Sequence, residues 1–321
     1  MENTKQYRLL EIFFRAFRGE DIFVQRLADE YGVSTKSITR CINDIKAFLA
    51  ENRDLVGNTE LRYSYQDKCY RLYMEEFLTN KELFALVEVM IGARAFSKLE
   101  LLALTDKLRG FTTTEDRAKL NTLISKELYH YSEVKHDCES VQDRLWQIVN
   151  CINEKREITI EYYKMDRSWV THRLCPVSVM FTDYYFYLIA FKTETDSKKP
   201  IYFRVDRIKH VTEHRKRFTA KEAPEFDEGL LRRRSLFMWP GKLRTVRFEF
   251  SGPSVQAVLD KLPTAKIIER SGTKYVIEAE TYGDGIKMWL LSQGSWVKVT
   301  EPAEFVIEMK AEIDKMQKLY E

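Results

Sequence analysis

Two short segments near the middle of the chain constrain the fold most: residues 184–190 (YYFYLIA) and 202–208 (YFRVDRI). Both are dense in aromatic and β-branched residues and are bounded by turn-forming residues, so they predict short β-strands. The first is apolar on both faces, which predicts a strand deep inside a small barrel or sandwich. The second places Arg204, Asp206 and Arg207 among its apolar positions. Two guanidiniums on such a strand are either paired internally or arranged to hold an anion.

The composition fits a globular protein of several domains. A chain of 321 residues predicts two or three domains. No apolar run predicts a membrane span and the N-terminus lacks a signal-peptide pattern, so we expect a cytoplasmic protein. The five cysteines are scattered without a Cys-x-x-Cys pair, which favours a reducing compartment and no zinc site; we expect no cofactor. Because the net charge of +3 is nearly balanced, any sign of nucleic-acid binding must be local.

The N-terminal region predicts three short helices followed by a β-hairpin. Apolar residues recur at helical spacing in residues 5–17 and 35–49, and Asp21 is placed to cap a helix between them. Alternating patterns at residues 60–65 and 70–73 predict the two strands of the hairpin. This order is typical of a winged helix-turn-helix, in which the third helix enters the major groove of DNA.

The outward face of the third predicted helix carries a polar, cation-bearing stripe. Arg and Asn can pair bidentately with guanine and adenine edges, while Lys and Thr hold phosphates. The candidate DNA-binding residues, including the helix cap and a lysine near the hairpin tip, are Ser34, Thr35, Lys36, Thr39, Arg40, Asn43, Lys46 and Lys68. The alternative is an ordinary solvated face, since acidic residues nearly equal basic ones in this segment. The Ala-x-x-Tyr-Gly-Val-Ser-x-x-x-Ile spacing with a hairpin behind it favours binding to double-stranded DNA.

The rest of the chain is helical first and then rich in strands. Residues 76–140 contain no strand pattern and predict a helical connector, with a dimer surface as the alternative. Short β elements then predict a strongly bent barrel of the Sm or SH3 type. The expected strands are residues 157–163, 169–175, 184–191, 201–205 and 209–213.

Four motifs follow one another in this strand-rich region: residues 160–162 (IEY), 172–176 (HRLCP), 186–188 (FYL) and 203–208 (FRVDRI). In order and spacing they resemble a WYL domain, with Phe186 in place of the eponymous tryptophan. Together with the predicted winged helix, they make the chain similar to WYL-domain transcriptional regulators over essentially its full length.

The resemblance implies a sensory domain whose pocket binds an anionic effector, in several family members a nucleotide or single-stranded DNA. Guanidiniums suit phosphates and tyrosine rings suit bases, so the chemistry agrees with the motif positions. The effector-binding candidates are Tyr187, Arg204, Arg207, His172, Arg173 and Asp206. The alternative is a structural salt bridge between Asp206 and one arginine, with Tyr187 in the core. We expect both in part, with Asp206 orienting one arginine and leaving the other free.

The C-terminal third predicts strand, helix, strand, strand, helix, strand and a final helix, which is the ferredoxin-like βαββαβ pattern. It is similar to the C-terminal extension that often follows WYL domains and, in that family, contributes to dimerisation. The expected fold is therefore α+β with several domains. The expected parts are a winged helix-turn-helix DNA-binding domain (1–75), a helical connector (76–140), a WYL effector-sensing domain (141–219), a linker (220–242) and a C-terminal WYL extension (243–321).

We interpret the chain as a bacterial-type transcriptional regulator that forms a homodimer. It would bind double-stranded operator DNA, and an anionic effector (a nucleotide or single-stranded nucleic acid) would shift the balance between DNA-competent and incompetent arrangements. One alternative is a nucleic-acid-sensing accessory protein of a defence or DNA-damage response system. A nucleic-acid-processing enzyme is a weaker alternative, since the sequence offers neither a metal cluster nor a nucleophile with its base. Repression and activation are not distinguished by the sequence.

Overall fold

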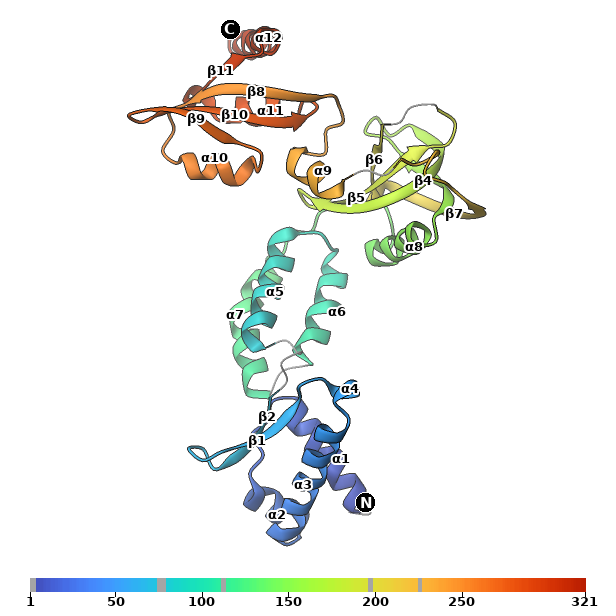
Figure 1. Cartoon of the computed structure of the whole chain (residues 1–321), viewed down its shortest axis with the longest axis vertical. Helices are drawn as coiled ribbons and strands as arrows, with labels where there is room; N and C mark the ends of the chain where they lie inside the picture. The colour runs from blue at the N-terminus through green and yellow to red at the C-terminus, as the bar shows by residue number, and fades with distance from the viewer. Residues whose placement is uncertain (1–3, 74–78, 111–113, 196–198, 225–226) are drawn as a thin grey trace. The chain divides into compact units, whose positions relative to one another are not determined.

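The structure is a computed structural model that describes residues 4–73, 79–110, 114–195, 199–224 and 227–321. The chain divides into two compact units, Met1–Lys135 and His136–Glu321, which are described in turn. It combines helices with three antiparallel sheets, as an α+β fold requires (Figure 1). Within the part of the chain that the structure describes, every helix is too short or too polar to span a lipid bilayer.

The first unit begins with three helices packed around one core. The elements are α1 (Lys5–Phe17), α2 (Val24–Tyr31), α3 (Thr35–Glu51), α4 (Arg53–Val56), β1 (Glu60–Ser64) and β2 (Cys69–Tyr73). The inward face of α3 is the one expected from the apolar spacing, because Ile38, Ile42, Ile45 and Leu49 are all buried. A backbone bridge between Ile22 and Tyr70 adds a third short segment to the hairpin. The helices and the hairpin therefore share one hydrophobic core.

Asp21 has a different role from the expected helix cap. Helix α2 begins at Val24, and its N-cap Phe23 makes no side-chain capping bond. The Asp21 carboxylate instead accepts hydrogen bonds from Arg71 of β2, with Nε 2.6 Å from Oδ1 and Nη2 2.7 Å from Oδ2. These bonds hold the pKa of Asp21 below its usual value. The capping prediction was wrong because a bidentate arginine on the adjacent strand β2 outcompetes the local backbone N–H groups.

Three further helices complete the first unit: α5 (Asn80–Ala93), α6 (Lys98–Arg109) and α7 (Thr114–Tyr129). Helix α5 starts at a capping box, in which Thr79 and Glu82 each bond the backbone of the other. The three helices bury a separate apolar cluster that includes Val87, Leu101 and Ile124.

The second unit opens with α8 (Val141–Asn153) and a five-stranded antiparallel sheet. The sheet elements are β3 (Arg156–Tyr163), β4 (Trp169–Thr182), β5 (Tyr185–Lys192), β6 (Ile201–Arg204), the 3₁₀ turn η1 (Val205–Arg207) and β7 (Ile208–Arg217). The strand order is β6-β5-β4-β3-β7, so η1 joins the two edge strands directly. A three-residue connection between opposite edges requires a strongly curved sheet.

The predicted closed barrel was wrong in one respect. Among the described residues, β6 pairs only with β5 and β7 only with β3, so no ladder closes the sheet. The expected strand over residues 202–208 ends at Arg204, and the next three residues form η1, where the Ile208 N–H bonds the Val205 carbonyl. Asp206 and Arg207 therefore lie on a turn instead of a strand.

Alternation along the strands separates the two faces of this sheet. Ile158, Leu188 and Phe203 belong to the core that Ile148 of α8 also enters. On the opposite, outer face, Ile189 and Met180 are buried with residues that follow β7 in the sequence. Strand β5 is thus covered on both faces, as its continuous apolar pattern predicted.

The segment expected to be a linker contains the helix α9 (Glu228–Arg234). Its Leu231 packs with Met238 on the outer face of the five-stranded sheet. Its three consecutive arginines also make specific contacts: Arg232 donates to the Phe181 carbonyl, Arg233 to the Pro263 carbonyl and Arg234 to the Glu280 carboxylate. Helix α9 therefore connects the five-stranded sheet to the C-terminal sheet.

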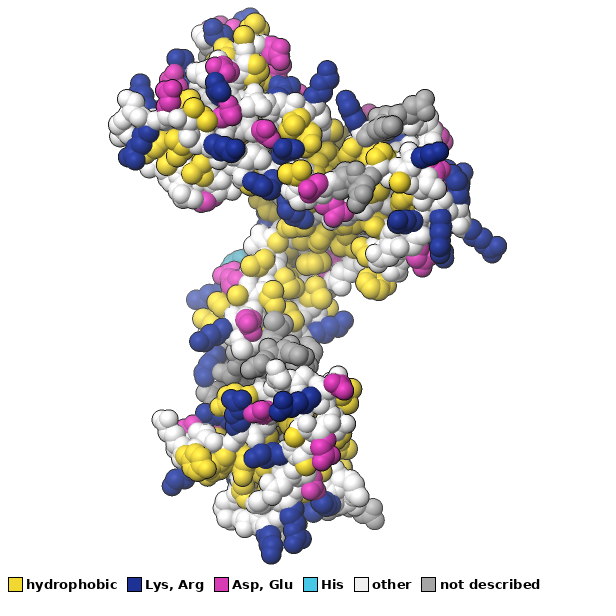
Figure 2. All heavy atoms as spheres, viewed as in Figure 1, with side chains coloured by type: hydrophobic (Ala, Val, Ile, Leu, Met, Phe, Trp, Pro, Cys, Tyr) yellow, Lys and Arg dark blue, Asp and Glu magenta, His cyan; other side chains and the backbone are white. Residues whose placement is uncertain are grey.

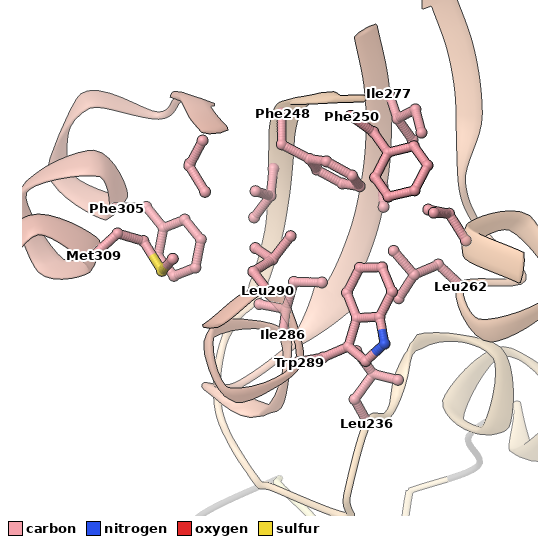
Figure 3. Close-up of a cluster of buried hydrophobic side chains, with 14 residues drawn as sticks. Leu236, Phe248, Phe250, Leu262, Ile277, Ile286, Trp289, Leu290, Phe305 and Met309 are labelled. Carbon is pink, nitrogen blue, oxygen red and sulfur yellow. The ribbon is translucent and has the colours of Figure 1, made fainter. Parts of the chain in front are cut away.

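The C-terminal sheet has the order β11-β8-β10-β9, with all neighbours antiparallel. Its elements are β8 (Leu243–Phe250), α10 (Val255–Lys261), β9 (Lys266–Ser271), β10 (Lys274–Tyr282), α11 (Gly285–Ser292), β11 (Val297–Glu301) and α12 (Ala303–Lys318). This is the topology that the βαββαβ pattern describes. Figure 3 shows the core, where Phe248 and Trp289 meet edge to face and Leu236 enters beside Trp289. The stretch after α9 is thus anchored in this core.

Candidate nucleic-acid interface and effector site

The structure places the candidate DNA-binding residues of α3 on one accessible stripe. Ser34 caps the helix, its Oγ accepting a hydrogen bond from the Ser37 N–H at 3.3 Å. Lys36, Arg40 and Asn43 follow as exposed residues, and among the described residues no carboxylate pairs with either cation. Figure 2 shows Lys and Arg side chains projecting from the region of α2 and α3. Exposed, uncommitted cations at the start of a helix suit an anionic duplex.

The remaining candidates of this group lie at the two ends of the stripe. Thr35 is exposed. The Thr39 hydroxyl donates a hydrogen bond to the Thr35 carbonyl at 3.0 Å, so this hydroxyl already has one partner within the helix. Lys46 is exposed toward the hairpin, with Nζ 5.7 Å from the centre of the Tyr70 ring. Lys68 is exposed in the turn between β1 and β2 with a positive φ of 53°. The hairpin therefore presents one cation at its tip.

The second candidate site is built on Arg204 at the end of β6. Its guanidinium donates to both carboxylate oxygens of Asp206, with Nε 3.0 Å from Oδ1 and Nη2 2.6 Å from Oδ2. Its central carbon lies 3.3 Å from the centre of the Tyr185 ring. Burial alone would lower the pKa of Arg204, but the bonds to Asp206 outweigh burial and raise it. Arg204 is therefore a fixed cation between a carboxylate and an aromatic face.

Tyr187 and Arg207 lie next to this pair. Tyr187 is the cross-strand partner of Arg204, and its burial raises its pKa, against which the Arg204 charge acts. Arg207 follows Asp206 in η1, is half-buried and pairs with no carboxylate among the described residues. Asp206 thus holds Arg204, and Arg207 makes no such pair among the described residues.

The other two candidates, His172 and Arg173, are neighbours on β4 and point to opposite faces. His172 lies on the inner face, with its ring centre 5.4 Å from that of Phe203. Burial, assisted by the charges of Lys192 and Lys164, lowers its pKa. A neutral histidine on the inner face does not join Arg204, which lies on the outer face with Tyr187.

Arg173 is engaged by a buried carboxylate. Its Nε lies 2.8 Å from Oε2 of Glu157, whose side chain is fully buried, and Lys216 Nζ lies 2.5 Å from the other oxygen. The Lys216 ammonium has its pKa raised to about 12 by hydrogen bonds to Glu157 and Glu222. Sequence reasoning missed Glu157, although a carboxylate next to apolar residues in a strand indicates a need for cations if it is buried. Arg173 is therefore part of a structural network in this structure.

Two residues beside Arg204 were not predicted. Tyr185 alternates with Tyr187 along β5, so its place on the outer face followed from the strand period. His136 lies outside any periodic segment, and no sequence pattern indicated its role. Its imidazole is buried, with Nδ1 3.6 Å from Oδ2 of Asp206 and no hydrogen-bond partner for either nitrogen among the described residues. His136 thus packs against the carboxylate that holds Arg204.

Comparison with known proteins identifies this region. Residues 143–213 match the family model of the WYL domain, so this part of the chain is a WYL domain, as the motif order predicted. No curated protein matches the chain.

Two solved structures are similar to the chain. One is described as Proteasome accessory factor B/C (PafBC) of Arthrobacter aurescens, at 17% sequence identity and a TM-score of 0.30, covering 96% of this chain and 48% of that one. The chain therefore spans about half the length of that protein. The other is described as a CRISPR Cas-related protein, at 16% identity and a TM-score of 0.40, covering 77% of this chain and 75% of that one. At such low scores we draw no functional conclusion from either structure.

Proposed function

We propose that this chain, which contains a WYL domain, is a DNA-binding transcriptional regulator. Residues of α3 and the β1–β2 hairpin bind operator duplex DNA, and the WYL domain binds an anionic effector that changes the affinity for the operator. The observation that supports DNA binding is the exposed stripe of Lys36, Arg40 and Asn43, which lies on a capped helix followed by a hairpin. The same helix buries Ile38, Ile42, Ile45 and Leu49 on the face opposite the stripe, which leaves the stripe accessible to DNA.

The effector half of the proposal is supported by the arrangement around Arg204. A fixed guanidinium and two tyrosine rings lie together at the end of β6, and Arg207, which pairs with no carboxylate among the described residues, follows in η1. This set suits a nucleotide or a single-stranded nucleic acid, because guanidiniums bind phosphates and tyrosines stack on bases. Binding acts as a switch if the effector has different affinities for the DNA-competent and incompetent arrangements.

A homodimer is also part of the proposal. Helix α12 buries Phe305 and Met309 in its own domain, whereas Ile313 and Met316, further along the helix, are exposed. Apolar positions that continue beyond the domain core suit a second copy of the same helix. Two copies would also double the modest cation count that each DNA-binding region offers. Sedimentation of Ile313→Glu tests this part, with a monomer as the expected product.

Operator binding is tested by fluorescence anisotropy with duplexes from the promoter region of its own gene and with random duplexes. We expect the logarithm of the affinity to fall linearly with the logarithm of the salt concentration. We also expect tighter binding to the promoter duplex than to random duplexes. Absence of salt-dependent binding to every duplex would contradict the DNA-binding role. A preserved operator affinity with no response to nucleotides or oligonucleotides would contradict the effector role alone.

A further inference from the structure

A cavity of about 560 Å³ lies between the edge of the WYL-domain sheet and the C-terminal sheet. Its walls come from the start of β6, helix α9, the stretch leading into β8, and the end of β10. The residues whose side chains matter here are Lys199, Tyr202, Leu231, Lys242, Leu243 and Tyr282. Volumes of about 300–1,000 Å³ are typical of small-molecule sites. None of these residues belongs to the pair formed by Arg204 and Asp206.

The lining combines an apolar interior with a cationic rim. Two tyrosines and several Leu and Pro side chains form the interior, and two exposed lysines stand at the edge. The only carboxylate among the described lining residues is Asp227, which accepts a bond from the Leu230 N–H at 2.8 Å as the cap of α9. The cavity therefore has net positive charge and no arginine fork among its described lining residues. The Lys242 ammonium suits a compact anion, and the rings and aliphatic side chains suit a flat apolar body.

The walls are held in place by close backbone packing. A Cβ added at Gly241 would lie 2.3 Å from the Cα of Gly283, and one added at Gly283 would lie 2.5 Å from the Trp239 carbonyl oxygen. The stretch before β8 is thus packed backbone to backbone against the turn that follows Tyr282. Leu236 and Met238, on the same stretch, are buried in different cores. The cavity is therefore preformed, which lowers the cost of binding.

Both tyrosines lie in one environment. Tyr202 and Tyr282 pack partly buried against the cluster of Met180, Ile189, Leu231 and Met238. Burial raises the pKa of Tyr202, and the nearby Tyr282 raises it further. The Tyr202 phenol therefore stays neutral at physiological pH, and both tyrosines offer ring faces to a ligand.

We propose that this cavity is a second ligand site, which binds a small aromatic carboxylate. The ring lies against Tyr202 and Tyr282, and the carboxylate lies at the rim beside Lys242. A ligand held there contacts both β6 and β10, so it ties the WYL-domain sheet to the C-terminal sheet. The site is separate from the effector residues Arg204 and Arg207.

The test is isothermal titration calorimetry on the full chain with 2-naphthoate and its neutral analogue 2-naphthalenemethanol. We expect naphthoate to bind at least about tenfold more tightly than the alcohol. Lys242→Glu should weaken naphthoate about tenfold or more and leave the alcohol unchanged. Tyr282→Ala should weaken both probes, and Tyr282→Phe, which keeps the ring, should bind both as the wild type does. Lys274→Glu, at the other end of β10, is the matched charge control.

Two results overturn the proposal: no saturable naphthoate binding up to about 1 mM, or equal naphthoate affinity in the wild type and Lys242→Glu. Because Lys242 is exposed, this variant keeps the fold even if Tyr282→Ala does not, and thermal unfolding checks both. Operator DNA is absent from the experiment, so its outcome is independent of the DNA-binding proposal.

Discussion

The Asp206 carboxylate accepts two hydrogen bonds from the Arg204 guanidinium, whose central carbon in turn lies 3.3 Å from the centre of the Tyr185 ring. This arrangement answers the question posed by two arginines in one apolar motif. One arginine is fixed by an internal carboxylate, and the other, Arg207, pairs with no described carboxylate. The two residues should therefore differ in what their loss does to the protein, because only one of them stabilises a buried charge.

Replacing Asp206 by Asn should destabilise the second unit by about 3 kcal/mol, because the substitution leaves the buried Arg204 charge without its counter-ion. Burial alone would raise the Asp206 pKa, but the hydrogen bonds from Arg204 and the neighbouring His136 together lower it below its usual value. A carboxylate with a lowered folded pKa stabilises the fold above its unfolded pKa and loses that effect as pH falls through the folded value. Urea unfolding from pH 7 downward should show a constant difference from wild type until about pH 4 and a shrinking one below. A difference that grew on acidification would contradict the pair.

Replacing Arg173 by Ala should reduce stability and leave effector affinity unchanged. The reason is its bond to the fully buried Glu157, which would then rely on Lys216 alone. Chemical denaturation measures the loss of stability, and nucleotide binding to the folded variant measures the effector affinity. Arg215→Ala, an exposed arginine on β7, is the control and should change neither. Loss of nucleotide binding in a stable Arg173→Ala protein would show that Arg173 takes part in effector binding.

Replacing Arg40 or Asn43 by Ala should cost about 1–3 kcal/mol of operator affinity and relax base preference, because these side chains can form bidentate contacts with base edges. Lys36→Ala should weaken operator and random duplexes alike and reduce the salt slope by about one, as a phosphate contact does. Lys107→Ala on α6 serves as a charge control in the first unit. Equal losses on operator and random DNA from Arg40, Asn43 and Lys36 variants would contradict this division of roles.

The sequence predicted best where one regular period decided the outcome. The buried face of α3 followed from local spacing, and the WYL domain followed from motif order. It failed where distant residues compete for one group. Asp21 satisfied the local rule for a helix cap, yet Arg71, fifty residues away, holds it. His136 and Glu157 gained their roles from three-dimensional contacts that no periodicity encodes.

Replacing Arg207 by Ala should abolish effector binding without loss of stability, whereas Arg204→Ala should lose both. Arg207 pairs with no described carboxylate, so its removal leaves no buried charge unpaired. Removal of Arg204 leaves the Asp206 carboxylate, which is buried beside His136, without its counter-ion, at a cost of about 3 kcal/mol. The measurements are thermal unfolding and retention of nucleotides and short single-stranded oligonucleotides in a pull-down, with operator binding recorded in parallel. Both variants should bind operator DNA if they fold, because α3 is untouched. If Arg207→Ala retains every nucleotide and oligonucleotide that the wild type retains, the anion is bound elsewhere; if it unfolds as readily as Arg204→Ala, Arg207 is structural too.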